Sequence, residues 1–209
     1  MIKIAIPSSH SRIHTKVMNI LKIQELLNPK KVVYWGTDAV VLVFRPWDIP
    51  RLLKENRIDF GFSGLDTFIE LGCEKLVFDR FYSDTSRIAY CRNSCSKNNS
   101  NNGLVVATEY PSISSRYFFE KEMKVQILKI RGSAEAFPNL DGISAIVDVV
   151  ETGTSTRVNH LKVCDSIMTT YPCLAASEKA KHNWPEIGFT NIRNIINDCL
   201  SQPGDESSV

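Results

Sequence analysis

The sequence predicts an α/β protein made of two small domains. Strand patterns and amphipathic helix patterns alternate along the chain, which is typical of α/β folds. The 209 residues, 43% of them hydrophobic, suffice for one large domain or two small ones with real cores. An asparagine- and serine-rich run at 93–103 cannot bury a core and predicts a surface loop. We favour two domains, residues 1–90 with 172–200 and residues 91–171, followed by a disordered polar tail at 201–209.

The first half of the chain predicts strands that lead into polar loops and helices. Ile2–Ile6 is a strand pattern, and the polar stretch Pro7–Arg12 leads from it into a helix pattern. Because helix N-termini open at such loops, Arg12 is a candidate ligand-binding cation, although a solvated arginine in the first turn explains it equally well. Lys30–Tyr34 and Ala39–Phe44 are expected to form a hairpin or two neighbouring strands. The other elements expected here are a helix opened by Pro50 and capped by Asp48, a strand from Ile58, a helix at Thr67–Gly72, and strands at Lys75–Tyr82 and Ser86–Tyr90.

A glycine-containing loop follows the strand that begins at Ile58. Ser63 and Gly64 carry little bulk ahead of Asp66, so a flat ligand could approach the backbone at this point. Asp66 could equally cap the helix that follows.

Residues 104–160 predict a small doubly wound unit. Three loops, 108–112, 131–135 and 151–156, each follow a strand pattern, and the carboxyl ends of parallel strands meet at one edge, where ligands bind. The expected elements of this unit are strands at Leu104–Ala107, Val125–Ile130 and up to Val150, a helix at Ile113–Glu122 with Tyr117, Phe118 and Met123 in the core, and a short helix from Gly132 to Phe137. After the unit we expect strands at Val163–Met168 and Leu174–Ser177 and a final helix within Trp184–Leu200.

The stretch from Gly142 to Thr156 predicts an anion-binding loop. Its β-branched strand runs into Asp148 and Glu151, and Thr152–Thr156 then offers backbone N–H groups and hydroxyls with little side-chain bulk. Such a loop suits a phosphate, while the two acids could face ribose hydroxyls or a magnesium ion. An ordinary turn between two elements would have the same composition.

Composition excludes several classes of protein. The formal charge of +2 gives no strong field to recruit nucleic acid or membrane, and the N-terminal strand is too short for a signal peptide or a membrane span. Six cysteines without C-x-x-C spacing indicate reduced thiols in a cytoplasmic protein. His10 and His14 have metal-ligand spacing only if both lie on the first helix, and we favour one loop and one surface residue.

Several motifs occur in a linked order. They are Ala107–Pro111, Arg116–Phe118, Lys129–Glu135 and Ala145–Gly153, with Asp48–Pro50, Asp59–Gly61 and Gly64–Asp66 upstream. In these motifs the chain resembles the short form of ATP phosphoribosyltransferase, the first enzyme of histidine biosynthesis, over most of residues 1–178. The chain ends where the short form ends, so we expect it to lack the C-terminal regulatory domain of the long form.

The resemblance implies a two-domain α/β core similar to type II periplasmic binding proteins, with a ligand cleft between the domains. The family joins N1 of the adenine of ATP to C1 of phosphoribosyl pyrophosphate (PRPP) and releases pyrophosphate, with magnesium. Departure of pyrophosphate leaves a cation-like carbon, so catalysis should consist of positioning and charge neutralisation without a covalent nucleophile. The resemblance also implies a homo-oligomer and a regulatory subunit similar to histidyl-tRNA synthetase.

Site residues follow from the same resemblance. The 5-phosphate loop corresponds to Thr152, Gly153, Thr154, Ser155 and Thr156, and the residues bordering that pocket are Ser133 and Glu135. Asp148 and Glu151 would lie near the ribose and the metal, with Asp148 as the metal ligand, and Arg12 would join them as a catalytic residue. The acceptor would lie against Arg12, Ser63, Gly64, Asp66 and Arg87.

Departures from the family pattern leave the acceptor open. The loop Pro7–Arg12 lacks the family's lysine, Lys30 and Lys31 stand where an arginine is usual, and Leu65 replaces a common lysine. One alternative is therefore a paralogue that uses a different heterocyclic acceptor without a triphosphate. A second alternative is a non-catalytic binding or regulatory subunit, which the retained Asp148 and Glu151 argue against.

Overall fold

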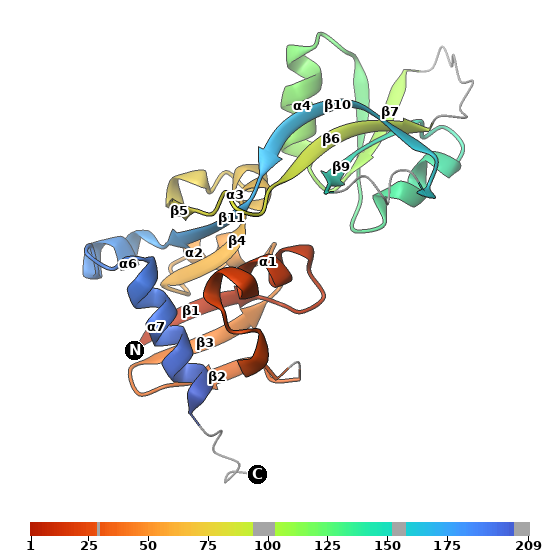
Figure 1. The fold of residues 1–209 in the computed structure, drawn as a ribbon. Helices are drawn as coiled ribbons and strands as arrows, with labels where there is room; N and C mark the ends of the chain where they lie inside the picture. The colour runs from red at the N-terminus through yellow and green to blue at the C-terminus, as the bar shows by residue number, and fades with distance from the viewer. Residues whose placement is uncertain (29, 94–102, 152–157, 203–209) are drawn as a thin grey trace. The chain divides into compact units, whose positions relative to one another are not determined.

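The computed structural model divides the chain into two compact α/β units (Figure 1). Unit 1 comprises Met1–Asp84 and Tyr171–Val209, and unit 2 comprises Thr85–Thr170. The residues that the structure describes are 1–28, 30–93, 103–151 and 158–202. The first boundary lies at Thr85 rather than at residue 91, because the strand β6 (Ser86–Asn93) pairs along its length with two strands of unit 2.

Unit 1 contains a six-stranded sheet in the order β2-β3-β1-β4-β11-β5. Its strands are β1 (Ile2–Pro7), β2 (Val33–Trp35), β3 (Ala39–Phe44), β4 (Phe60–Gly64), β5 (Val77–Arg80) and β11 (Pro172–Ala176). Strand β1 runs parallel to β3 and β4, so the carboxyl ends of these three strands share one edge of the sheet. Strands β2 and β3 pair antiparallel, which confirms the predicted hairpin.

Helices cover both faces of the unit 1 sheet. They are α1 (Arg12–Leu21), α2 (Ile49–Lys54), α3 (Leu65–Glu70), α6 (Glu178–Asn183) and α7 (Phe189–Ser201), with 3-10 turns η1 (Gln24–Leu26) and η2 (Glu74–Leu76). Side chains of α1, α6 and α7 form one core with Phe60 and Phe62 of β4. On the opposite face, a Cβ at Gly61 would lie 2.5 Å from Ile49 of α2, so glycine permits this close packing.

The start of α2 differs from the prediction. Asp48 occupies the N-cap position, but its backbone is already helical and its side chain accepts no capping hydrogen bond. Pro50 near the first turn, with φ fixed by its ring, starts the helix without that cap. Among the described residues, no helix is long and apolar enough to span a membrane.

Unit 2 contains a five-stranded sheet in the order β10-β6-β9-β7-β8. Its remaining strands are β7 (Leu104–Thr108), β8 (Val125–Lys129), β9 (Ala145–Val150) and β10 (Leu161–Thr170). Strand β7 lies parallel to both β8 and β9, whereas β6 pairs antiparallel with β9 and β10. The three parallel strands therefore end at one edge, as the sequence predicts.

Two helical elements pack on the unit 2 sheet. They are α4 (Pro111–Glu120) and the 3-10 helix η3 (Ala134–Asn139). Phe118 of α4 is buried and lies edge-on to Tyr90 of β6, with ring centroids 5.2 Å apart. Met123, which we expected in the core, lies beyond the end of α4 and is 39% exposed. On the other face, η3 packs over a core that includes Cys91, Ile146 and Leu161.

Candidate functional site

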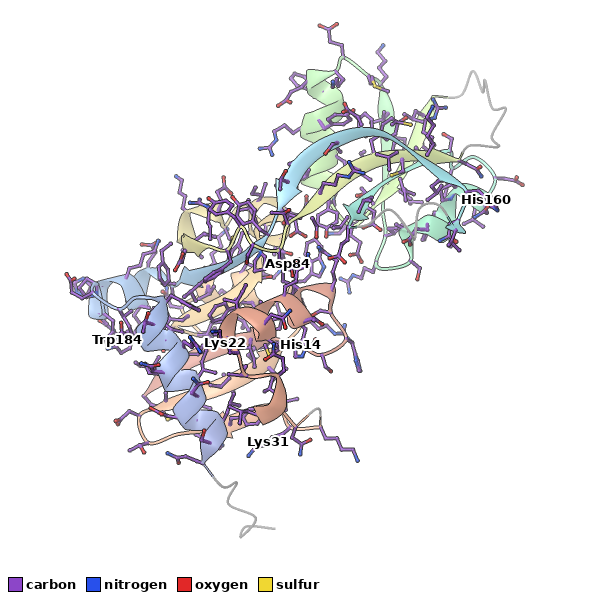
Figure 2. The ribbon with its side chains drawn as sticks, viewed as in Figure 1. His14, Lys22, Lys31, Asp84, His160 and Trp184 are labelled. Carbon is purple, nitrogen blue, oxygen red and sulfur yellow. The ribbon has the colours of Figure 1, made fainter. Side chains whose placement is uncertain are left out.

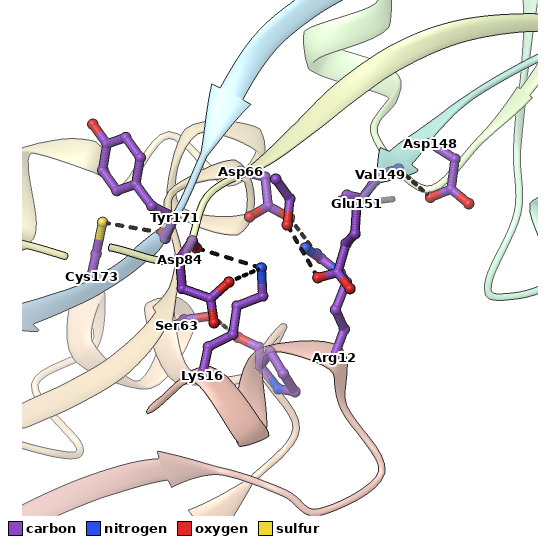
Figure 3. A network of polar contacts seen from close by, with 12 residues as sticks. Arg12, Lys16, Ser63, Asp66, Asp84, Asp148, Val149, Glu151, Tyr171 and Cys173 are labelled. Atoms are coloured by element: carbon purple, nitrogen blue, oxygen red, sulfur yellow. Dashed lines mark hydrogen bonds and ion pairs between the residues drawn. The ribbon is translucent and has the colours of Figure 1, made fainter. Parts of the chain in front are cut away.

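An ion pair joins two predicted site residues at the carboxyl edge of the unit 1 sheet. Arg12 opens α1 just beyond β1, and Asp66 lies in the first turn of α3, just beyond β4. The Arg12 Nη2 atom lies 3.4 Å from the Asp66 Oδ2 atom. Asp66 is 1% exposed and Arg12 is 31% exposed, so a buried carboxylate holds a cation that still reaches solvent (Figure 3). Asp66 lies in the first turn rather than at the cap, which is Gly64.

A second cation, which the sequence analysis missed, lies one helical turn after Arg12. Lys16 is 9% exposed, and its Nζ atom lies 2.9 Å from the Asp84 Oδ1 atom and 3.4 Å from the Asp84 carbonyl oxygen (Figure 3). Residues four apart share one face of a helix, so the helix pattern could have pointed to this residue once Arg12 was singled out. Unit 1 therefore carries two ion-paired cations on one face of α1.

Ser63 and Gly64 shape the same edge through the backbone. The Ser63 hydroxyl donates to the Pro46 carbonyl at 3.0 Å, which ties the end of β4 to the segment after β3. A Cβ at Gly64 would collide with the Asp66 carboxylate, so the glycine leaves room for the buried acid. These contacts give both residues a structural role. Their predicted contact with a flat ligand stays a prediction.

The two N-terminal histidines do not share the first helix. His10 precedes α1, whereas His14 lies within it (Figure 2). The His14 Nδ1 atom lies 2.8 Å from the Pro7 carbonyl oxygen, which fits donation from the ring and fixes the loop between β1 and α1. The helical spacing that a metal pair needs is therefore not met.

In unit 2, hydrogen bonds tie together the ends of the three parallel strands. The buried Thr108 hydroxyl, at the end of β7, donates to the Val147 carbonyl of β9 at 2.7 Å and accepts from the Tyr110 backbone N–H at 2.9 Å. Beyond β8, the Ile130 N–H donates to the Thr108 carbonyl at 3.0 Å, and the Gly132 N–H donates to the Glu109 carboxylate. The loops 108–112 and 131–135 are therefore held side by side.

Ser133 lies in a turn of unusual backbone conformation. Its φ is +49°, and that of the preceding Gly132 is +72°, so two successive residues are left-handed. For serine this conformation costs roughly 1–2 kcal/mol, and the surrounding hydrogen bonds must hold it. Glu135 follows in the first turn of η3.

Asp148, Arg87 and Glu135 surround the buried thiol of Cys91. In the antiparallel register Asp148 opposes Ala89 and Arg87 opposes Val150, so Asp148 and Arg87 lie on one face of the sheet. Burial, with smaller contributions from Cys164 and from the negative charges of Asp148 and Glu135, raises the pKa of Cys91 to about 12, against the opposing effect of Arg87. The Asp148 Oδ1 atom also accepts from the Val149 N–H at 2.7 Å. Arg87 thus belongs to unit 2, beside Asp148, and not to the first domain where the sequence placed it.

Glu151 points away from Asp148. The Ser86 hydroxyl donates to its Oε1 atom at 3.1 Å (Figure 3). Ser86 and Arg87 are consecutive in β6 and so lie on opposite faces. The two acids at the end of β9 therefore face different sides of the sheet, a separation that the strand alternation alone could have indicated.

The structure does not describe the predicted phosphate loop, but it does bear on the predicted metal site. Thr152, Gly153, Thr154, Ser155 and Thr156 lie outside the described residues. Within the described parts of the chain, no group of three or more His, Cys, Asp or Glu side chains could hold a metal ion. Single carboxylates such as Asp148 fit magnesium only when substrate phosphates supply further ligands, which is how this ion is commonly bound.

The comparisons with known proteins decide the family. The family model of ATP phosphoribosyltransferase matches residues 45–199. The chain belongs to the ATP phosphoribosyltransferase family. This confirms the resemblance derived from the sequence motifs.

Two curated relatives carry that family name. The ATP phosphoribosyltransferase of Methanopyrus kandleri is 32% identical over 189 residues, covering 86% of this chain and 66% of that protein. That of Campylobacter fetus is 31% identical over 187 residues, covering 86% of this chain and 90% of that protein. The chain thus spans just under two thirds of the archaeal relative and most of the bacterial one.

Solved structures confirm the two-domain α/β fold. The ATP phosphoribosyl transferase (HisG:HisZ) complex from Thermotoga maritima is similar with a TM-score of 0.76 and 24% identity, covering 95% of this chain and 96% of that one. A Candida albicans protein described as exhibiting the generic periplasmic binding protein structural fold has a TM-score of 0.55 at 15% identity, covering 95% of this chain and 69% of that one. The expected periplasmic-binding-protein-like class is therefore correct.

Proposed function

We propose that the protein transfers the phosphoribosyl group of PRPP to N1 of the adenine of ATP and releases pyrophosphate. The observation that carries this proposal is the edge of the unit 2 sheet at which the parallel strands β7, β8 and β9 all end. It carries the proposal because the chain belongs to the ATP phosphoribosyltransferase family. Parallel strands bind ligands at that edge.

Unit 2 would hold the phosphoribosyl group. Asp148 lies two residues before the end of β9, just beyond its pairing with β7, and Arg87 lies on the same face of the sheet. The Asp148 carboxylate can accept from ribose hydroxyls, and Arg87 offers positive charge. Ser133 and Glu135 follow the end of β8, and residues 152–156 follow β9 as the proposed 5-phosphate loop. Glu151, which bonds Ser86, would act by fixing the strand end rather than by touching the ribose.

Unit 1 would hold the phosphates of ATP. Arg12 and Lys16 lie one turn apart on α1, each paired with a carboxylate that a triphosphate could replace as the partner. Lys16 supplies a lysine on this edge although the Pro7–Arg12 loop lacks one. This favours ATP over an acceptor without a triphosphate.

Magnesium would neutralise the pyrophosphate as it leaves C1. Asp148 is the proposed protein ligand, and the phosphates would supply most of the others. The remaining catalytic contribution of the chain is to align the two substrates and to exclude water from the reacting carbon.

Assembly and location are part of the same proposal. Because the similar Thermotoga maritima structure is a HisG:HisZ complex, we infer that this protein can take a partner subunit. From the family resemblance we further infer that the partner is a regulatory subunit similar to histidyl-tRNA synthetase, and that the protein is a homo-oligomer in the cytoplasm. We infer no nucleic-acid or membrane partner.

Calorimetry with magnesium tests the reaction. PRPP is titrated first and ATP second, and pyrophosphate is then assayed after mixing. Binding of both substrates with release of pyrophosphate is the expected result. Binding of PRPP without ATP, repeated with the regulatory subunit present, would indicate a different acceptor. Binding of neither substrate would favour the non-catalytic alternative.

A further inference from the structure

One carboxylate joins two turns at the edge of the unit 2 sheet. Glu109 follows the last residue of β7, and its Oε1 atom accepts from the backbone N–H of Gly132, beyond the end of β8. Among the described residues Glu109 has no other polar partner. Glu109 is half-buried, so the bond lies at the surface where a ligand would approach.

The residue next to Glu109 is a rigid anchor. Thr108 is fully buried, donates to Val147 of β9 at 2.7 Å and accepts from Ser114 of α4 at 3.4 Å. The Thr108 carbonyl also accepts from Ile130 at 3.0 Å. Thr108 and Glu109 therefore hold Ile130, which precedes the turn, and Gly132, which is its first left-handed residue.

The turn needs such a support. Gly132 and Ser133 are both left-handed, and serine adopts this conformation only where its surroundings impose it. Beyond the turn, the Ala136 N–H donates to the Ser133 carbonyl at 3.1 Å and Ala134 is 2% exposed, so η3 fixes the other side. The Glu109 bond closes the side that faces solvent.

We propose that Glu109 is a positioning residue that holds Gly132 and Ser133 in the conformation that binds PRPP. The inference rests on the proposed function. A positioning role for Glu109 can be told apart from a role as a magnesium ligand or a ribose contact. Holding the Gly132 N–H needs only an acceptor oxygen and not the negative charge of the carboxylate. Glutamine keeps such an oxygen and loses the charge.

The experiment compares Glu109→Ala and Glu109→Gln with the native protein, with Glu120→Ala at the exposed end of α4 as the matched control. PRPP affinity is measured by calorimetry with magnesium, and amide hydrogen exchange is followed in peptides that cover residues 130–137. We expect Glu109→Ala to bind PRPP about tenfold more weakly and to exchange faster in this segment, with kcat at saturating PRPP within about twofold. Glu109→Gln and Glu120→Ala should stay within about twofold of the native affinity.

A second variant keeps the test independent of folding defects. Gly132→Ala strains the turn from its other side, where a Cβ meets no atom within 4 Å, so it should weaken PRPP binding by a similar factor. In the double variant with Glu109→Ala, the loss of PRPP affinity should be smaller than the sum of the two single losses, because both changes disrupt the same backbone conformation at Gly132 and Ser133.

Three results would overturn the inference. They are native affinity and exchange in Glu109→Ala, equal losses in Glu109→Gln and Glu109→Ala, and full additivity in the double variant. If the native protein binds no PRPP, the proposed function fails instead, and the exchange measurement alone still decides whether Glu109 holds the turn.

Discussion

The two sheet edges are built by different means. In unit 1 charged side chains meet in pairs, Arg12 with Asp66 and Lys16 with Asp84. In unit 2 the backbone is tied instead, through Thr108 to Val147 and through Glu109 to Gly132. An edge of paired charges has to exchange partners when an anion binds, whereas an edge of fixed backbone groups can receive one without rearranging.

From this difference we infer that the two edges bind different substrates. A tied backbone suits a ligand of fixed shape such as a ribose phosphate, because a preorganised site loses little entropy on binding. Long cationic side chains suit a flexible polyphosphate, which they can follow. The first three predictions below test whether the two edges act on different substrates, and the last two concern stability.

The largest effect should come from Asp148→Asn in unit 2. Loss of the carboxylate that we propose faces the ribose should lower turnover on the order of a hundredfold, with little change in melting temperature. Steady-state kinetics and thermal unfolding measure both quantities, and Asp141→Asn, on the exposed turn before β9, is the control. Normal turnover would remove Asp148 from the site.

Arg12→Ala should come next and act on unit 1. It leaves Asp66 buried without its arginine, so the free energy of unfolding should fall by about 1–3 kcal/mol, the partial exposure of Arg12 limiting the loss. ATP binding should weaken while PRPP binding stays native. Chemical denaturation and calorimetry test this, and a loss of PRPP affinity would contradict the division between the edges.

Lys16→Met should have a smaller effect on the same edge. The substitution keeps the buried stem and removes the charge, and Asp84 is 42% exposed, so the unfolding free energy should change by about 1 kcal/mol or less. The KM for ATP should rise several-fold with an unchanged KM for PRPP. The exposed Lys22→Met, at the end of α1, is the matched control. An unchanged KM for ATP would leave Lys16 with a purely structural role.

Ser133→Gly should affect stability only slightly. Glycine relieves the left-handed strain of Ser133 but adds entropy to the unfolded chain, so the net gain should be about 0–1 kcal/mol in unfolding free energy. Ser133→Ala keeps the strain and separates the role of the hydroxyl in PRPP binding. A clear loss of stability in Ser133→Gly would mean that the serine side chain holds the turn.

The smallest effect should appear at acid pH, away from both edges. The Tyr117 hydroxyl donates to Asp165 at 2.8 Å and, with Lys121, lowers the pKa of this carboxyl. A lowered pKa in the folded state stabilises the protein above the ordinary value near 4 and ceases to do so as the pH falls through the lowered value. Asp165→Asn should therefore flatten the dependence of melting temperature on pH below about 4. An unchanged slope would show that Asp165 adds nothing to acid stability.

Local signals in the sequence were sufficient for most of the fold. The hairpin of β2 and β3, the three parallel strands of unit 2 and the helix within 184–200 follow from periodicity and turn residues. Asp48 and Met123 were assigned wrongly, because capping and burial depend on tertiary surroundings that a local pattern does not contain. The unit boundary was misplaced because β6 joins unit 2 through long-range pairing.

The candidate site was predictable where a residue stands beside a strand end. Arg12 and Asp66 lie in the first turns of the helices that follow β1 and β4, and Asp148 lies two residues before the end of β9. Lys16 was missed because it lies inside a helix, and Glu109 because its partner Gly132 is remote in sequence. Contacts of this kind arise only when the sheet brings loops together.

The pairing of Ser86 with Thr170 places the two ends of unit 2 side by side. Within unit 1 the Phe81 N–H donates to the Pro172 carbonyl at 3.0 Å. Unit 2 is therefore an inserted domain that interrupts unit 1 at a single loop, and β pairing holds the two ends of the insertion together. This arrangement permits unit 2 to be expressed alone, or to be replaced by a short turn, without breaking a strand of either sheet. The two units could then be varied or exchanged separately.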